Sequence, residues 1–324
     1  MAETMNAILP ENYPQLVWGT LPRPVAGPGQ LLVRVRAAGI NRADLVQAAG
    51  HYPPPPGEST VLGLEIAGEV VAVGDGADGF AVGDAVFGLV PGGGYAEYCV
   101  LDALLAVRKP EALDWFEAAS LPEVWMTVWL NLVELGELQA GQRLLVHAGA
   151  SGIGAAAIQL GKRLGADVVV TIGSKEKADW CTALGADRAI NYREQDFVAE
   201  VKAGGGADLI LDTVGGDYLG RDQLCLNRDG RIIVIGLLRG KAAELNLGLL
   251  LVKRQRVQGS ALRSQPLAVK AKLANALATQ LLPDIIAGRL KPSLDRVFDI
   301  ADVRAAHAYV ADNRNQGKVV LRLA

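Results

Sequence analysis

The chain is poor in cysteine, histidine and aromatic residues. Among its 324 residues, 3 are Cys, 3 are His and 5% are aromatic. Cys99, Cys181 and Cys225 lie far apart, and no CxxC pair occurs. We therefore expect neither a disulfide framework nor a zinc lobe built from cysteines, and a reducing compartment fits this composition.

Excess positive charge and long apolar runs are also missing. The formal net charge is -3, so no broad basic field exists to hold nucleic acid or an anionic membrane. The longest apolar runs are far shorter than the ~20 residues of a membrane span. The first residues, MAETMNAILPENYP, lack the basic and apolar regions of a signal peptide. We expect a cytoplasmic protein that binds neither nucleic acid nor a membrane.

Glycine and aliphatic residues are plentiful instead. The chain has 38 Gly and is 50% hydrophobic, which is typical of α/β proteins with tight strand–helix turns. Its length suggests two domains. Residues 1–124 contain short strand candidates separated by Gly and Pro, at Leu31–Val35, Gly63–Val73 and Asp84–Val90. This part of the chain is predicted to be a compact β-rich domain.

The sequence pattern changes near residue 115. Trp115–Leu135 has a helical pattern that Pro122 kinks or divides. Strand, glycine-rich turn and helix then alternate, which predicts a parallel sheet with helices on both faces. The strands are expected at Arg143–His147, Asp167–Ile172, Ala189–Asn191, Leu209–Asp212, Arg231–Ile235 and Arg256–Ser260. Beyond Ser264 the pattern predicts a helix at Leu267–Ala287, a strand near Val297, a helix at Val303–Val310 and a strand at Val319–Leu323.

The strongest local motif joins the first of these parallel strands to a helix. It reads RLLVHAGASGIG, with glycines at Gly149, Gly152 and Gly154. Such glycines let a pyrophosphate approach the backbone, and the positive end of the helix dipole stabilises its charge. The same spacing occurs in short-chain dehydrogenases, but no tyrosine here has the lysine four residues later that those enzymes require. The motif predicts dinucleotide binding in a Rossmann domain.

The end of the second parallel strand indicates which dinucleotide is bound. An NAD site places Asp or Glu there to hold the ribose 2′-hydroxyl. This strand continues instead into Gly173, Ser174 and Lys175, and Lys177 follows. Hydroxyl and ammonium groups suit a 2′-phosphate. We therefore expect NADPH, although the lysines could also be the solvated first turn of a helix.

These motifs together resemble the zinc-free quinone oxidoreductases of the medium-chain dehydrogenase/reductase superfamily, most closely the tumour-suppressor-inducible subgroup. The resemblance covers essentially the whole chain. It rests on GINRAD from Gly39, YPPP from Tyr52, GLEIAG from Gly63, PGGGYAEY from Pro91, the glycine motif and NQGK from Asn315. It implies a GroES-like catalytic domain formed by residues 1–124 and 263–324, with a Rossmann domain of residues 125–262 inserted between them.

The resemblance also implies roles for individual residues. Asn41 and Tyr52 would lie near the nicotinamide and the substrate, where their side chains could donate hydrogen bonds to a developing oxyanion. Thr127 would contact the nicotinamide. Ser151 and Ile153, with the glycines of the motif, would bind the pyrophosphate, and Ser174, Lys177 and Tyr192 the 2′-phosphate. The rest of the cofactor groove would be lined by Gly173, Val214, Gly236, Leu237, Leu262, Arg263, Asn315, Gly317 and Lys318.

Metal is not expected. Zinc-dependent members of the superfamily carry Cys where this chain has Asn41 and His where it has Leu64. His51, His147 and His307 are scattered singly, whereas a zinc site needs three or four ligands together. His147, placed in a strand, is more readily explained as a core residue with satisfied hydrogen bonds.

Three functions remain open at this stage. The first is NADPH-dependent reduction of a quinone or similar conjugated carbonyl. The second is zinc-free reduction of an enone or enoyl thioester, although no obvious basic cluster for coenzyme A is present. The third is a cofactor-binding structural protein without turnover. We also expect a homodimer, formed partly through the sheet edge at residues 249–260, where the apolar run Leu249–Val252 leads into the last parallel strand.

Overall fold

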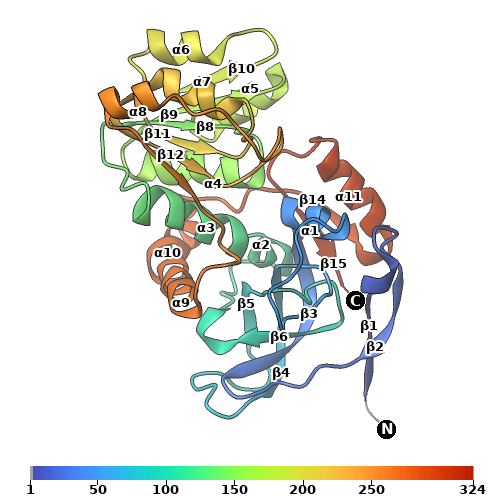
Figure 1. The fold of residues 1–324 in the computed structure, drawn as a ribbon. Coiled ribbons are helices and arrows are strands. Elements are labelled where there is room, and N and C mark those ends of the chain that lie inside the picture. The colour runs from blue at the N-terminus through green and yellow to red at the C-terminus, as the bar shows by residue number, and fades with distance from the viewer. Residues whose placement is uncertain (1–2, 324) are drawn as a thin grey trace. The chain divides into compact units, whose positions relative to one another are not determined.

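The computed structural model describes residues 3–323 and divides the chain into two units (Figure 1). Residues up to Met126, together with those from Arg263 onward, form a β-rich unit. Thr127–Leu262 form a parallel-sheet unit.

The β-rich unit is built on a seven-stranded sheet whose strands come from before and after the parallel-sheet unit in sequence. The C-terminal strand β15 runs antiparallel to β3, pairing Val319 with Ile40. Because β15 also pairs with β14, residues from beyond the inserted unit complete the sheet. The strand order is β14 (Leu294–Asp299), β15 (Lys318–Arg322), β3 (Gln30–Ile40), β4 (Glu65–Val73), β5 (Ala85–Leu89) and β7 (Ala106–Arg108), with β6 (Tyr98–Asp102) also paired to β3.

Short helices and a hairpin surround this sheet. Asp114 caps α2 by accepting the N–H groups of Phe116 and Glu117, and Pro122 begins α3, so the predicted break at this proline is confirmed. We predicted neither the hairpin of β1 (Thr4–Ile8) and β2 (Trp18–Pro22) nor the helix α1 (Arg42–Ala48). The other helices are α2 (Trp115–Ala119), α3 (Pro122–Val128), α9 (Leu267–Ala276), α10 (Leu282–Ile286) and α11 (Val303–Ala311).

The parallel-sheet unit is a doubly wound Rossmann fold. All of its strand pairs are parallel, and the order reverses direction between β8 and β11, which makes that point the crevice where such sheets bind ligands. In spatial order the strands are β10 (Arg188–Asn191), β9 (Asp167–Ile172), β8 (Arg143–Val146), β11 (Ala207–Asp212), β12 (Leu226–Val234) and β13 (Arg256–Gly259). The six strands expected from the sequence are all present.

Five α-helices and the π-helix Trp129–Glu134 accompany this sheet within the described residues, and a polar cluster lies in its core. The α-helices are α4 (Gly152–Arg163), α5 (Lys175–Ala183), α6 (Phe197–Ala203), α7 (Tyr218–Cys225) and α8 (Leu247–Lys253). His147 is fully buried just after β8, with Nδ1 2.9 Å from Thr171 Oγ1 and Nε2 2.8 Å from Asp222 Oδ1. Both ring nitrogens therefore have partners, which confirms that His147 is a satisfied core residue.

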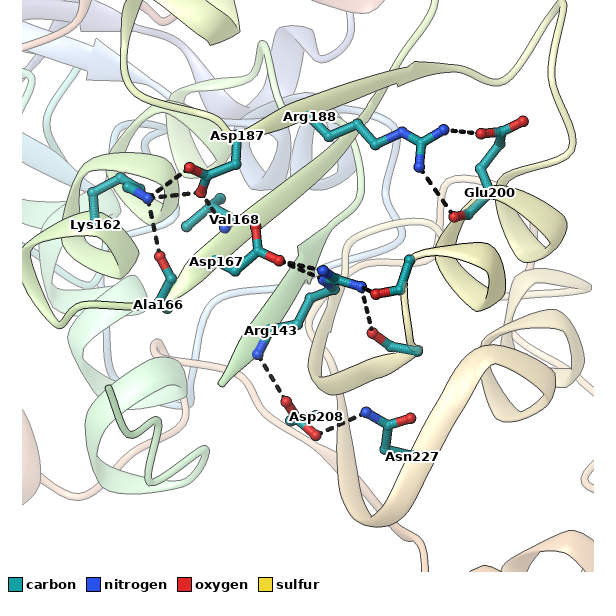
Figure 2. Close-up of polar contacts among 12 residues, drawn as sticks. Arg143, Lys162, Ala166, Asp167, Val168, Asp187, Arg188, Glu200, Asp208 and Asn227 are labelled. Atoms are coloured by element: carbon teal, nitrogen blue, oxygen red, sulfur yellow. Dashed lines mark hydrogen bonds and ion pairs between the residues drawn. The ribbon is translucent and has the colours of Figure 1, made fainter. Parts of the chain in front are cut away.

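Ion pairs and hydrogen bonds join the strands at the edge where they begin (Figure 2). The first residues of β8 and β9 meet where Arg143 Nε donates to Asp167 Oδ2 at 2.6 Å, and the Arg143 N–H donates to Asp208 of β11 at 2.8 Å. Lys162 at the end of α4 pairs with Asp187 at 2.7 Å. These contacts occupy the amino-terminal edge of the sheet, so the opposite edge, where the strands end, is the one available for a ligand.

Candidate functional site

The glycine motif forms a sharp turn between β8 and α4. Ala148 adopts a left-handed backbone with φ 55°, and the Gly149 N–H donates to the Thr171 carbonyl at 3.0 Å. A β-carbon on Gly149 would lie 2.6 Å from the Val170 β-carbon, and one on Gly154 would lie 2.3 Å from the Gly149 carbonyl oxygen. The close packing of the turn against β9 therefore explains two of the three glycines without any ligand.

The first turn of α4 offers hydrogen-bond donors. Ser151 is the N-cap, and its Oγ accepts the Gly154 N–H at 3.0 Å. Within residues 3–323, the N–H groups of Gly152 and Ile153 donate to no other group. Two unsatisfied N–H groups at the positive end of a 12-residue helix suit a phosphate. The residues present therefore fit the pyrophosphate of a dinucleotide.

The tip of β9 brings together the residues predicted to hold a 2′-phosphate. Ser174 caps α5 by accepting the Lys177 N–H at 3.3 Å. The Tyr192 hydroxyl, from the end of β10, would lie 2.8 Å from a β-carbon on Gly173, and Arg193 Nε would lie 3.5 Å from it. We did not predict a role for Arg193. The available signal was its position directly after Tyr192, which follows the same strand. No carboxylate belongs to residues 173–175, and the first acid is Glu176 in the first turn of α5.

The other cofactor candidates of the parallel-sheet unit follow strands at the same edge or lie where the chain crosses between units. Val214 follows β11, and its N–H donates to Asp212 Oδ1 at 2.7 Å. Gly236 and Leu237 follow β12, and Leu237 is 58% exposed. Thr127 is the first residue of this unit and Leu262 the last, and both are buried.

The β-rich unit contains a buried charge cluster around Asn41. Lys318 Nζ donates to Glu65 Oε1 at 2.6 Å, to Asn41 Oδ1 at 2.8 Å and to the Ile40 carbonyl at 2.9 Å. Asn41 Nδ2 donates to the same Glu65 oxygen at 2.9 Å. The two charged side chains are nearly inaccessible, at 4% and 0% exposure. These contacts fix the orientation of the Asn41 amide.

This cluster extends to α1 and α3. Asp44 is fully buried and accepts the N–H groups of Asn41 and Gly63, but burial raises the pKa of its carboxyl to about 6. Glu65 Oε2 accepts the Glu123 N–H at 2.8 Å, which anchors the start of α3 on β4. These roles of Asp44, Glu65 and Glu123 were not predicted, because they depend on contacts between elements that are distant in sequence.

Lys318 was expected to line the cofactor groove, but in the structure its ammonium forms hydrogen bonds within the β-rich unit. Its three protons have three acceptors inside the β-rich unit, which leaves none for a phosphate. The residues before it form a turn in which Asn315 Nδ2 donates to the Gly317 carbonyl at 2.7 Å. Gly317 has φ 101°, and a β-carbon there would lie 2.1 Å from the Ser293 carbonyl oxygen. This turn positions Lys318.

Tyr52 and Arg263 lie together in the same unit. The Arg263 guanidinium is 5.1 Å from the centre of the Tyr52 ring and donates to the Pro91 carbonyl at 2.6 Å. Burial raises the pKa of the Tyr52 hydroxyl, and the nearby Glu123 raises it further. Tyr52 therefore remains protonated at neutral pH and can donate a hydrogen bond.

The side chains at the positions of a possible zinc site differ from zinc ligands. Leu64 is a buried aliphatic residue, and the Asn41 amide is already hydrogen-bonded. Among residues 3–323, no group of three or more His, Cys, Asp and Glu side chains is arranged to hold a metal ion. Over the same residues, no helix combines the length and apolarity needed to cross a membrane.

Comparison with known proteins places both units in one superfamily. Residues 27–111 match the alcohol dehydrogenase GroES-like domain, and residues 152–279 match the family described as zinc-binding dehydrogenase. The chain is 34% identical to prostaglandin reductase-3 of Mus musculus over 322 residues, covering 93% of this chain and 83% of that protein. The predicted pairing of a GroES-like β-rich domain with a Rossmann domain is thereby confirmed.

Polyketide synthases are also among the relatives. The chain is 36% identical over 300 residues to the spectinabilin polyketide synthase system protein NorB of Streptomyces orinoci. This match covers 91% of the chain but 13% of that protein, so the chain spans about an eighth of the length of this relative.

Solved structures resemble the whole chain. A quinone oxidoreductase from Pseudomonas syringae superposes with a TM-score of 0.86 at 29% identity, covering 100% of both chains. A mycobacterial protein complexed with NADPH gives 0.87 at 27% identity, covering 98% of this chain and 100% of that one. The CurK enoyl reductase gives 0.84 at 27% identity, covering 99% of both.

We expect Gly152→Val to abolish dinucleotide binding without unfolding the protein. Gly152 is the first residue of α4 and lacks the positive φ that would demand glycine, so a β-branched side chain there obstructs the donors of the helix terminus more than it strains the backbone. Isothermal titration with NADPH and circular dichroism measure the two effects. Gly149→Val is the comparison: its crowding against Val170 should cost about 1–3 kcal/mol of stability. Normal NADPH affinity in the Gly152 variant would show that the motif is only a structural turn.

Proposed function

Because this chain belongs to the medium-chain dehydrogenase/reductase superfamily of NAD(P)-dependent oxidoreductases, we propose that it reduces a quinone or similar conjugated carbonyl with NADPH and without metal. The proposal rests on the groups found at the edge of the parallel sheet where the strands end. There the unsatisfied donors of α4 adjoin a β9 tip where residues 173–175 offer a hydroxyl and an ammonium group but no acid, although Glu176 follows in the first turn of α5. When bound, NADPH would supply the hydride.

The chain's own residues would position and polarise the acceptor. Hydride arrival places negative charge on a carbonyl oxygen, and a hydrogen-bond donor near that oxygen stabilises it. Tyr52 keeps its proton at neutral pH, and the Asn41 amide retains one N–H beyond the one that Glu65 accepts. Because Asn41 and Leu64 occupy the positions of zinc ligands in zinc-dependent members, hydrogen bonding takes the place of a metal in this proposal.

A zinc-free enone or enoyl-thioester reductase is the alternative. The likeness to the CurK enoyl reductase and to a polyketide synthase favours it, and it needs the same fold and the same hydride donor. The two candidates differ in the acceptor, so substrate profiling separates them. A cofactor-binding protein without turnover is the remaining candidate.

We expect the purified protein to oxidise NADPH when a benzoquinone or naphthoquinone is added, and to keep this activity after exhaustive chelation. Absorbance at the NADPH band measures turnover, and elemental analysis measures zinc. Crotonyl thioesters and cyclohexenone, tested in parallel, examine the alternative. One tightly bound zinc per chain, or loss of activity on chelation, would contradict the metal-free reading of Asn41 and Leu64.

NADPH should bind at least about tenfold more tightly than NADH, which corresponds to ~1.4 kcal/mol. The 2′-phosphate would gain Ser174, Lys177 and Arg193 as partners and would meet no carboxylate among residues 173–175, where an NAD site places one. Fluorescence titration with both cofactors measures the ratio, and Lys177→Glu should reduce it, whereas Lys202→Glu on α6 should not. Equal affinities in the wild-type protein would remove the argument from the β9 tip.

We also propose that two copies associate through the outer edge of the parallel sheet. β13 is the last strand in its sheet, and the neighbouring helix α8 exposes three apolar side chains: Leu247 at 63%, Leu251 at 76% and Val252 at 70%. An edge strand beside an apolar surface needs to be covered, and a second copy does so symmetrically.

Light scattering at micromolar concentration should therefore give the mass of a dimer. Leu251→Arg should shift the protein toward monomer, because a cation placed in an apolar contact must be desolvated. Leu104→Arg is the matched control, since Leu104 is 60% exposed in the β-rich unit. A wild-type monomer would contradict this assembly.

A further inference from the structure

The Asn41 amide is held in one of its two orientations by charged neighbours from two other strands. Asn41 follows β3, Glu65 begins β4 and Lys318 begins β15. An ammonium only donates hydrogen bonds, so the amide oxygen faces Lys318 Nζ at 2.8 Å. A carboxylate only accepts them, so the amide nitrogen faces Glu65 Oε1 at 2.9 Å. Turning the amide over would set nitrogen against the ammonium and oxygen against the carboxylate, so the ion pair excludes that orientation.

One proton of this amide remains for a ligand. The amide nitrogen of Asn41 has two N–H groups, and Glu65 accepts one of them. The other has no acceptor among residues 3–323, and Asn41 is partly exposed. Because its oxygen is taken by Lys318, the amide offers a ligand a hydrogen-bond donor and no acceptor.

The ammonium of Lys318 is fixed in place and acts on the amide at close range. All three of its protons have acceptors, which are Glu65 Oε1, Asn41 Oδ1 and the Ile40 carbonyl. The Lys318 and Glu65 side chains are almost inaccessible to solvent, so water screens their charges little. A positive charge on the amide oxygen draws electron density from the nitrogen, and hydrogen bonds linked in this way strengthen one another. The remaining N–H of Asn41 is thus a stronger donor than that of a free amide.

We propose that Lys318 and Glu65 are positioning residues of the reductase, which lock and polarise the Asn41 amide so that its remaining N–H meets the substrate carbonyl oxygen. That oxygen is the atom on which hydride transfer places negative charge, so the inference rests on the proposed function. The pair also has a structural role, because Glu65 Oε2 accepts the Glu123 N–H at the start of α3. The experiments therefore have to separate positioning from stability.

Removing both charges together makes this separation. Lys318→Met alone leaves the Glu65 carboxylate buried without its cation, so its melting temperature should fall strongly. Lys318→Met combined with Glu65→Gln leaves neither charge and keeps a side-chain oxygen for the Glu123 N–H, so the melting temperature should return close to that of wild type. The control is Arg322→Met combined with Asp299→Asn, which removes a more exposed ion pair from the same strand β15.

Turnover then distinguishes the two roles. With a quinone that the wild-type protein reduces, we expect the Lys318→Met/Glu65→Gln variant to have a kcat lower by about 10²–10³, the cost of losing one oxyanion donor. Its NADPH affinity should be unchanged, and the control variant should keep the wild-type kcat. A purely structural pair predicts that kcat recovers together with the melting temperature, and that result would overturn the proposal.

A double-mutant cycle identifies the residue through which the pair acts. Asn41→Ala should lower kcat in the wild-type background by a similar factor. In the Lys318→Met/Glu65→Gln background it should have little further effect, because the same interaction is already lost. Effects on kcat that multiply would show that the pair acts through a group other than Asn41, and the proposal would fail.

Nuclear magnetic resonance tests the lock without turnover. In protein made with ¹⁵N-labelled asparagine, the Asn41 side-chain signals are those missing from Asn41→Ala. In the wild type, the proton accepted by Glu65 should be shifted downfield and exchange slowly with solvent, and the Lys318→Met/Glu65→Gln variant should lose both properties. Duroquinone, whose ring has no free position for a thiol to attack, or cyclohexenone should shift the second proton in the wild type only. A wild-type amide that exchanges freely, or that responds to neither compound, would contradict the proposal.

The outcomes separate the positioning role from the reductase function. If the wild-type protein reduces quinones and the Lys318→Met/Glu65→Gln variant regains kcat along with its melting temperature, the positioning role fails and the reductase function stands. If the wild-type protein reduces neither a quinone nor an enone, but the Asn41 amide is locked and responds to duroquinone, the reductase function fails and the positioned carbonyl site stands.

Discussion

The buried pair of Lys318 and Glu65 holds the β-rich unit together. One ammonium joins the last strand to the end of β3 and to β4, and the second oxygen of the same carboxylate receives the start of α3. Neither charge could remain buried alone, because removing one partner of such a pair leaves an uncompensated charge and costs about 3–5 kcal/mol. The orientation of the Asn41 amide and the location of Glu123 both follow from this pair.

In the parallel-sheet unit, the contacts that stabilise the fold and the groups available to a ligand lie at opposite ends of the strands. At the edge where the strands begin, Arg143, Asp167 and Asp208 satisfy one another (Figure 2). At the edge where they end, the N–H groups of Gly152 and Ile153 find no acceptor among the residues that the structure describes. A ligand with phosphate oxygens can supply these acceptors without competing with contacts that the fold requires.

Sequence patterns were sufficient for the parallel sheet and much less so for the other unit. Hydrophobic runs and glycine turns are local signals, so β9 was predicted at its observed bounds, and the break at Pro122 was foreseen. The hairpin of β1 and β2 was missed because its strands are short and Trp18–Pro22 lacks a strongly alternating pattern. The raised pKa of Glu123 could not be predicted from its neighbours in sequence, because it depends on burial and on the charges of Glu65 and Asp44, which lie in distant segments. For Lys318, the resemblance indicated a position near the cofactor groove. It did not indicate that the Lys318 ammonium forms an ion pair with Glu65.

The placement of β15 has a consequence for biosynthesis. Glu65 and the lysine that neutralises it are separated by 253 residues, and the whole parallel-sheet unit is translated between them. That unit is continuous in sequence and can fold during translation, before the rest of the chain has been synthesised. The β-rich unit cannot complete its fold until Lys318 emerges from the ribosome, and until then the Glu65 carboxylate at its centre has no lysine partner. A nascent chain that stalls after Leu262 therefore presents one finished fold beside one exposed, incomplete sheet, which is a substrate for chaperones and proteases.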